Sequence, residues 1–378
     1  MPIAAPFCLI EDRAAGEALL FAAPRKIVAA FRAEEVAPAF AALQQASRDG
    51  FWAAGYVAYE CGYALEPRLA PLLRPDGEKP LLLFGLFDAP GPAPALDAGG
   101  AARVEQLRAN WSFADYERRF AACRDYIAAG DVYQINLTFP VAGRWRGAPL
   151  DLYRRLRTRQ PVDLGGIVAL GGPTILSLSP EKFFVTRGDR IFARPMKGTA
   201  RRGVTPEEDR ALAEALARDE KNRAENLMIV DLLRNDISRL SEIGSVHVTD
   251  LFSVETFPTL HQMTSGVEAR LRPGLSFAEI FSGLFPCGSV TGAPKIRAME
   301  IIAALEAAPR DIYCGAIGVI APGGDMRFNV AIRTLTLRPD GSLTCPVGSA
   351  VVADSRVREE YEECLLKARF LTGETISG

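Results

Sequence analysis

Histidine is the scarcest chemistry-bearing residue of this chain, with two copies, His247 and His261, among 378 residues. Two histidines are too few for the usual zinc sites. The sequence also lacks the G-x-S-x-G motif of serine hydrolases, the dinucleotide fingerprint G-x-G-x-x-G after a predicted strand, and the phosphate loop G-x-x-x-x-G-K-[ST]. These absences argue against zinc enzymes, serine hydrolases and the common nucleotide-binding folds.

A strong net charge and long apolar runs are missing as well. Lys and Arg total 44 and Asp and Glu total 46, so no global basic field favours nucleic acid. No apolar run reaches ~18 residues and the N-terminus has no basic start, so we expect neither a membrane span nor a signal peptide. The seven cysteines are odd in number and scattered without C-x-x-C, which favours the reduced thiols of a cytoplasmic protein.

What remains is an ordinary globular composition, 48% hydrophobic and 24% charged, long enough for one large or two ordinary domains. Apolar runs predict strands at 56–59, 81–87, 132–139, 313–320, 328–337 and 342–352. Helical spacing predicts helices at 111–130, 206–235, 276–284, 294–305 and 355–371. Residues 89–102, rich in Pro, Gly and Ala, predict a linker or a long loop. Strands in groups with helices between the groups indicate an α+β fold.

Glu225 breaks the local rules of its predicted helix. Met228, Ile229 and Leu232 follow it at helical spacing, so its carboxylate lies on the apolar stripe. A carboxylate there is costly unless it is paired or bound to a metal. On this feature alone, an ion pair with a nearby Arg is the simpler explanation.

The closing helix carries a second group of carboxylates. Glu360, Glu363 and Lys367 share one face, because they are three and four residues apart. Two such carboxylates can hold a hard cation through their oxygens. A solvated helix with a Glu–Lys pair is the simpler alternative.

Residues 187–202 contain six cations, of which five arginines surround Lys197. Like charges nearby would lower the pKa of its amine and free it as a nucleophile. A basic surface loop explains the same pattern.

In 287–295, small residues lead into a helix start whose free N–H groups would favour an anion, although a simple tight turn is equally consistent. Together these features indicate a Mg²⁺-dependent enzyme acting on a small carboxylated substrate.

Nine ordered motifs give a sharper interpretation. They are GDVYQINLTF (130–139), LSPEKF (178–183), RPMKGT (194–199), DEKNRAENLMIVDLLRND (219–236), ETFPTLHQMTS (255–265), GSVTGAPKIRAMEII (288–302), YCGAIG (313–318), IRTL (332–335) and GSAVVADS with EYEECLLKA (348–368). With them, the chain resembles the chorismate-utilising enzymes, and within that family the aminodeoxychorismate synthases. GYVAYECGYALEP (55–67) is similar to a further, N-terminal motif of the family.

The resemblance implies two β-sheets packed as a sandwich with helices outside and the active site in a cleft. Residues 1–105 would be the N-terminal, less similar part of the sandwich, and 106–378 the chorismate-binding catalytic region. Fold and chemistry are separate claims, so roles are assigned residue by residue.

By similarity, Mg²⁺ would be held by Glu225, Glu360 and Glu363 and would act as a Lewis acid on the chorismate carboxylate. Glu181 would be the general acid for the leaving hydroxyl, which requires a raised pKa. The resemblance also implies which residues form the substrate pocket, in which Arg333 and Lys367 would pair with the carboxylates of the substrate. The implied pocket residues are Arg333, Lys367, Tyr313, Ser289, His261, Gly348, Ala350 and Gln134.

Lys197 distinguishes between branches of the family. Anthranilate synthases carry alanine at this place in P-x-[AK]-G-T, whereas a lysine is similar to the aminodeoxychorismate synthases. The implied reaction is attack of the Lys197 amine at C2 of chorismate, followed by ammonia at C4. Gln134 stands where the relatives that add water carry a lysine base, and a glutamine cannot deprotonate water.

Ammonia would come from a partner, because no cysteine lies in the G-x-C-x-G motif of glutaminases. The implied partner is a glutamine amidotransferase subunit, with product destined for p-aminobenzoate and folate. An anthranilate synthase large subunit is the first alternative. A non-catalytic sensor of an aromatic acid is the second, although a sensor has no need of a nucleophile. Nucleic-acid binding by the 187–202 cations is weakly supported, since Phe192 is the only aromatic residue among them.

Overall fold

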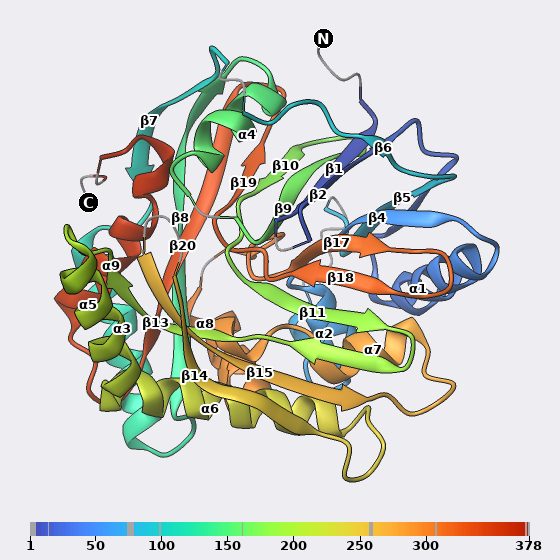
Figure 1. Cartoon of the computed structure of the whole chain (residues 1–378). Helices are drawn as coiled ribbons and strands as arrows, with labels where there is room; N and C mark the ends of the chain where they lie inside the picture. The colour runs from blue at the N-terminus through green and yellow to red at the C-terminus, as the bar shows by residue number, and fades with distance from the viewer. Residues whose placement is uncertain are drawn as a thin grey trace.

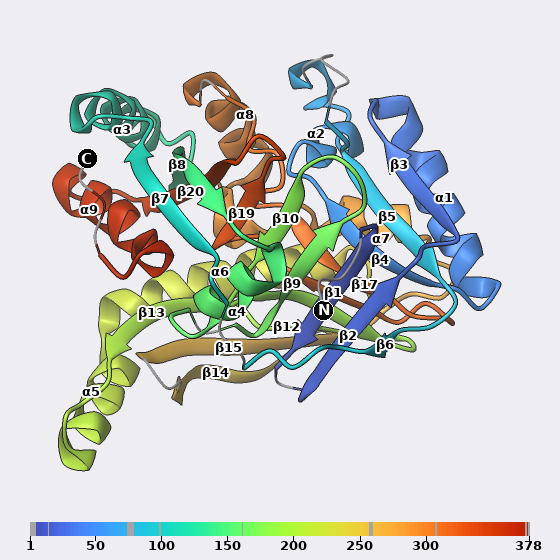
Figure 2. The same cartoon turned by 90° about the horizontal axis from the view of Figure 1, so that it is seen from above.

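Two antiparallel sheets form the centre of this computed structural model, which describes residues 5–13, 15–73, 79–97, 100–160, 162–256, 260–306, 308–374 and 376 (Figures 1 and 2). Within these residues each sheet has ten strands. In spatial order, the first sheet comprises β16 (Gly292–Ala293), β8 (Gln134–Arg146), β20 (Ser342–Val351), β19 (Thr334–Leu337), β10 (Thr174–Ser177), β9 (Leu164–Ala169), β1 (Phe7–Asp12), β2 (Glu17–Ala22) and β6 (Gly91–Pro92), with β7 (Arg103–Ala109) beside β8.

The second sheet follows the same antiparallel rule. Its order is β13 (Met196–Arg201), β15 (Leu260–Arg270), β12 (Arg190–Ala193), β11 (Lys182–Arg187), β18 (Met326–Asn329), β17 (Ala316–Ile320), β4 (Trp52–Val57), β5 (Leu82–Phe87) and β3 (Lys26–Ala30), with β14 (His247–Thr256) beside β15. Between the sheets, Ile10 and Phe21 of the first form one apolar cluster with Tyr56 and Ile317 of the second. The predicted α+β sandwich is confirmed.

Helices cover the outer faces of both sheets. The first sheet packs against α3 (Phe113–Ala128), α4 (Pro149–Arg157), α8 (Lys295–Leu305) and α9 (Val357–Lys367). The second packs against α1 (Ala33–Arg48), α2 (Cys61–Leu65), α5 (Pro206–Arg218), α6 (Glu220–Ser238) and α7 (Phe277–Leu284), and Figure 1 shows α6 running along β14 and β15. Short 3₁₀ turns are η1 (Ala70–Leu72), η2 (Gly288–Val290) and η3 (Arg369–Leu371). In the described part of the chain, no helix is long and apolar enough to cross a membrane.

Two predicted elements are each divided in the structure. The helix predicted over 206–235 is two helices, because the Asp219 side chain accepts a hydrogen bond from Asn222 N (2.7 Å) and starts α6 anew. The strand predicted over 328–337 is β18 in the second sheet and β19 in the first. The chain crosses between the sheets there, through Arg333 at φ +50°.

Residues 89–102 are not a free linker. β6 pairs with β2, and Leu96 and Ala102 are buried in the core of the first sheet. Residues 98–99 lie outside the described part, as do residues 257–259 of the ETFPTLHQMTS motif. Strands that precede residues 89–102 and strands that follow them contribute to both sheets.

Candidate active site

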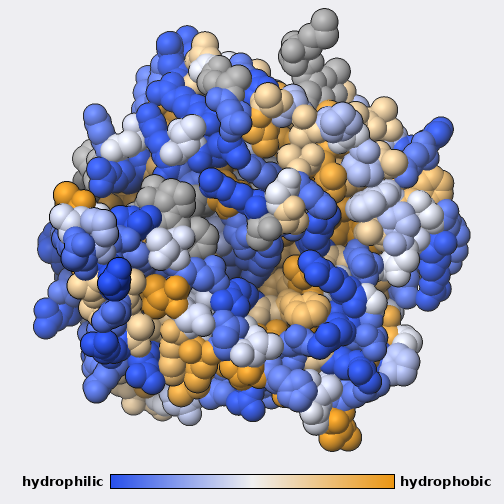
Figure 3. Space-filling model, in the orientation of Figure 1, coloured by the Kyte–Doolittle hydropathy of each residue, from blue (hydrophilic) through white to orange (hydrophobic). Residues whose placement is uncertain are grey.

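A cavity of ≈ 710 Å³ lies between the crossing segment, β13, β20 and the helices α6 and α9. Figure 3 shows a hollow near the centre of one face, with hydrophilic residues around it. Eleven of the thirteen predicted site residues line the cavity: Glu181, Lys197, Glu225, Ser289, Tyr313, Arg333, Gly348, Ala350, Glu360, Glu363 and Lys367. Segments separated by up to about half of the chain therefore meet at one place.

Lys197 reaches the cavity from an irregular strand. The pairing of β13 with β15 shifts register between Met196 and Thr199, and the intervening Gly198 has φ +86°. A Cβ on Gly198 would lie 2.8 Å from the Asn222 side chain, so this bulge requires glycine. Lys197 Nζ forms an ion pair with Glu225 Oε2 at 3.1 Å. The partner of Glu225 is thus this lysine rather than an arginine.

Glu181 is a buried carboxyl in the loop between β10 and β11, with 6% of its surface exposed. The Ser179 hydroxyl fixes the loop, because it donates to Val330 O (2.7 Å) and accepts from Glu181 N (3.1 Å). Burial raises the Glu181 pKa to about 7, although a hydrogen bond donated by Ser289 Oγ (2.9 Å) and the charge of Lys197 lower it. A carboxyl in this state can deliver a proton near neutral pH.

The three predicted metal ligands enter from two helices, Glu225 from α6 and Glu360 and Glu363 from α9. Glu363 pairs with Lys367 (2.6 Å), and Glu360 accepts a hydrogen bond from Ser355 Oγ (2.7 Å). Within the described residues, no group of three or more His, Cys, Asp or Glu is already close enough to hold a metal ion. The donors nevertheless fit Mg²⁺ in chemistry and location, since carboxylate oxygens are its preferred ligands and all three face one cavity.

Two cations in the lining of the cavity, Arg333 and Lys367, suit a carboxylated substrate. Arg333 donates to Gln160 Oε1 (2.6 Å), and burial lowers its pKa. Lys367 Nζ donates to Gly348 O (2.8 Å). A Cβ on Gly348 would lie 2.5 Å from Thr138 Cγ2, so glycine is required where β20 passes β8. Tyr313 lies beside them, and burial raises the pKa of its hydroxyl.

His261 and Gln134 are the two predicted residues that do not line the cavity. The His261 ring lies on the other face of β15, within hydrogen-bonding distance of Asp209 (2.9 Å) and Thr256 (3.0 Å). Its neighbour Gln262 faces the cavity instead, because successive strand residues point to opposite sides. Gln134 is fully buried, and among the residues that the structure describes its side-chain amide has no hydrogen-bond partner.

Sequence reasoning missed several lining residues. Asn136 belongs to the same strand motif as Gln134 two residues later, and Gln262 follows His261 directly. Strand alternation is the signal that could have identified both. Asp219, Lys221 and Asn222 also line the cavity, at the new start of α6. Finding them requires knowing that the helix breaks at Asp219.

The basic cluster of 187–202 is largely neutralised by carboxylates. Arg194 pairs with Asp250 and Glu255. Further pairs in this cluster are Arg190–Glu268, Arg201–Glu208 and Arg202–Asp209. The crowding of free like charges that the sequence suggests around Lys197 is therefore wrong. The α8 start does not line the cavity either, whereas Ser289 and Val290 of η2 do.

Comparison with known proteins shows the family of this chain. The profile of the chorismate binding enzyme family matches residues 5–373. Aminodeoxychorismate synthase component 1 of Klebsiella aerogenes is 44% identical over 256 residues, which is 68% of this chain and 56% of that protein. Anthranilate synthase component 1 of Cereibacter sphaeroides is 39% identical over 276 residues, 73% of this chain and 55% of that protein. The chain thus spans about half the length of these curated relatives.

A solved structure supports the fold as well. Anthranilate synthase component I of Streptococcus pneumoniae superposes with a TM-score of 0.81 at 26% identity, over 98% of this chain and 93% of that one. The family profile covers almost the whole chain, and the cavity gathers the residues of the family motifs. The chain belongs to the chorismate binding enzyme family.

Proposed function

We propose that this chain converts chorismate and ammonia into 4-amino-4-deoxychorismate. The observation that carries the proposal is Lys197, whose amine faces the same cavity as the buried carboxyl of Glu181. The similarity to proteins named aminodeoxychorismate synthase component 1, at 41–44% identity, supports it.

The chain's own side chains supply binding and orientation. Arg333 and Lys367 provide cations for the two carboxylates of chorismate. Glu225, Glu360 and Glu363 would hold Mg²⁺, which when bound supplies Lewis-acid withdrawal of electrons from the ring carboxylate. Lys197 Nζ forms an ion pair with Glu225 Oε2 at 3.1 Å, so the amine would have to lose a proton before it could act as a nucleophile.

The first step forms a bond between Lys197 Nζ and C2 and breaks the bond from C4 to its hydroxyl. Glu181 donates the proton with which that hydroxyl leaves as water. Lys197 enters as the neutral amine, so the nitrogen bonded to C2 is a secondary ammonium, which needs no further proton to leave in the next step. Ammonia then bonds to C4, and the C2–Nζ bond breaks to restore the lysine. Two successive displacements place nitrogen at C4 rather than C2.

The ammonia source is proposed to be a glutamine amidotransferase partner. All seven cysteines are buried, and burial raises the pKa of Cys61, Cys287 and Cys314, each of which precedes a glycine. A glutaminase needs an accessible, activated thiol. We therefore expect the chain alone to use ammonium but not glutamine.

Mass spectrometry of the products tests the proposal. The purified chain is incubated with chorismate and Mg²⁺, together with either ammonium or glutamine. We expect a product that retains the enolpyruvyl group and gains nitrogen, formed with ammonium only. Fluorescent anthranilate would instead support the alternative of an anthranilate synthase, and unchanged chorismate would support a binding protein.

A further inference from the structure

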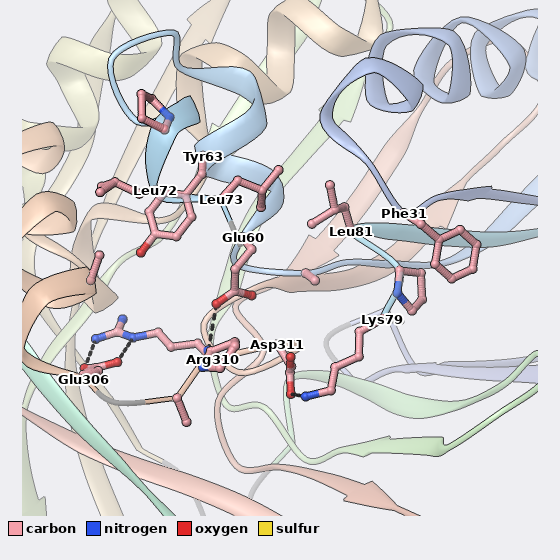
Figure 4. Close-up of a pocket in the computed structure, with 16 residues that line it drawn as sticks. Phe31, Glu60, Tyr63, Leu72, Leu73, Lys79, Leu81, Glu306, Arg310 and Asp311 are labelled. Carbon is pink, nitrogen blue, oxygen red and sulfur yellow. Dashed lines mark hydrogen bonds and ion pairs between the residues drawn. The ribbon is translucent and has the colours of Figure 1, made fainter. Parts of the chain in front are cut away.

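A second cavity, of ≈ 290 Å³, is lined by Arg310, whose guanidinium donates hydrogen bonds to the backbone oxygens of Val290 and Asn136 in the lining of the first cavity, here called the active cavity. It is built on the GYVAYECGYALEP motif, which the proposed reaction leaves without a role, and Glu60 and Tyr63 of that motif line it. The opposite side is formed by Glu306, Arg310 and Asp311, which follow α8. Figure 4 shows these residues around one space.

The lining is divided into an apolar side and a charged side. Leu72, Leu73, Leu81 and the partly exposed Phe31 supply the apolar side. Small-molecule pockets typically measure roughly 300–1,000 Å³. A cavity at the lower end of that range suits a compact ligand with one apolar and one polar end.

The charged groups leave one carboxyl without a cation. Asp311 pairs with Lys79 at 2.8 Å, and Glu306 pairs with the Arg310 side chain at 2.6 Å. Glu60 accepts a hydrogen bond from the backbone N–H of Arg310 (2.7 Å), and no cationic side chain of the described residues forms an ion pair with it.

The charged groups around Glu60 favour a cationic ligand. The groups that face it are Asp311 and Lys79, Glu306 and Arg310, and the Tyr63 hydroxyl. Burial, followed by the charge of Asp311, raises the Glu60 pKa to about 8. A cation would relieve both effects, whereas an anion would have to compete with Asp311 and Glu306 for Lys79 and Arg310, which already pair with them.

From this arrangement we infer that the second cavity binds a small primary ammonium ion with an apolar body. The ammonium group donates to Glu60, and the apolar body lies against Leu72, Leu81 and Phe31. Primary ammonium carries three donors, so it can reach Glu60 and a neighbouring carboxylate or carbonyl together.

Titration calorimetry of the full chain with phenethylamine tests this inference, in the absence of chorismate so that the result does not depend on the proposed reaction. Two matched probes have the same apolar body: 2-phenylethanol is neutral and 3-phenylpropanoate is anionic. We expect phenethylamine to bind about tenfold or more tightly than 2-phenylethanol, and the anion to bind least. Equal binding of the three probes, or no binding of phenethylamine, would overturn the inference.

Variants locate the bound probe. Glu60→Gln keeps an oxygen that can accept from Arg310 N–H, so the fold is preserved, and we expect phenethylamine affinity to fall about tenfold. The control Glu214→Gln removes an exposed carboxylate of α5 and should leave the affinity unchanged. If Glu60→Gln binds as the parent does while Lys197→Ala abolishes binding, the probe occupies the active cavity and the inference is wrong.

Discussion

The two cavities each contain a carboxyl whose pKa burial raises, and they differ in what lies beside it. Glu181 has Lys197 nearby and a hydrogen bond from Ser289, and its pKa is raised to about 7. Glu60 has Asp311 nearby and a backbone hydrogen bond, and its pKa is raised to about 8. Burial is common to both, and the neighbours differ: the charge of Lys197 lowers the pKa of Glu181, whereas the charge of Asp311 raises the pKa of Glu60 further. We propose that the first carboxyl donates a proton to the substrate and that the second binds a cation.

Arg310 belongs to the wall between the cavities. Its guanidinium donates to Val290 O (2.8 Å) and Asn136 O (2.6 Å), and both of these residues line the active cavity. The same guanidinium also donates to the carboxylate of Glu306, and both Arg310 and Glu306 line the second cavity. One buried cation therefore fixes a wall that both cavities share.

Removal of the amine of the active cavity should have the largest effect. Lys197→Ala is expected to reduce 4-amino-4-deoxychorismate formation by roughly 10³-fold or more, because covalent catalysis is lost. Product formation is measured by mass spectrometry at saturating ammonium. The control Lys26→Ala removes an exposed lysine of β3 and should retain activity. Full activity of Lys197→Ala would show that the amine is not the nucleophile.

Loss of the shared cation should disturb both cavities. Arg310→Ala leaves the buried Glu306 without its cationic partner, which is expected to cost about 3–5 kcal/mol of unfolding free energy and to raise the KM for chorismate. Urea unfolding and steady-state kinetics measure the two effects. Arg218→Ala, at an exposed ion pair, should change stability by less than about 0.5 kcal/mol. If Arg310→Ala folds and its KM for chorismate is unchanged, Arg310 does not support the lining of the active cavity.

Much of the active cavity could be predicted from the sequence. Helical spacing alone singled out Glu225 and the Glu360–Glu363 pair, because a carboxylate on an apolar stripe and two carboxylates on one face are local features. The resemblance added Glu181, Arg333 and the residues around them. The two-sheet fold followed from the same motifs, whose strands and helices the structure largely reproduces.

The features that could not be predicted from the sequence depend on contacts between residues that are distant along the chain. The sequence does not reveal that Asp250, Glu255 and Glu268 neutralise the basic cluster, because these carboxylates lie on neighbouring strands. It does not reveal that the chain changes sheet between β18 and β19. The second cavity was missed for the same reason, since Glu60 and Arg310 are 250 positions apart.

The protonation state of Glu181, the proposed proton donor, should appear in the pH dependence of the reaction. Glu181 acts when protonated, so kcat/KM is expected to fall as the pH rises through about 7, measured at constant free ammonia. Glu181→Gln should lower the rate by about 10²-fold and remove that limb, because the amide can hold the Ser289 hydrogen bond but cannot give up a proton. A limb that persists in Glu181→Gln would assign the acid to another group.

Glu60 should give the smallest effect, and it appears in stability rather than in turnover. Its folded pKa is raised, so wild-type stability is fully present below the unfolded pKa of about 4.5 and is lost as the pH rises through about 8. Glu60→Gln cannot ionise and should therefore be more stable than the parent at pH 8, by on the order of 1 kcal/mol. Urea unfolding at pH 5 and pH 8 measures the difference, with Glu214→Gln as the exposed control. Parallel pH dependence of wild type and Glu60→Gln would mean that Glu60 is already ionised beside a cation, which would remove the contrast between the two cavities.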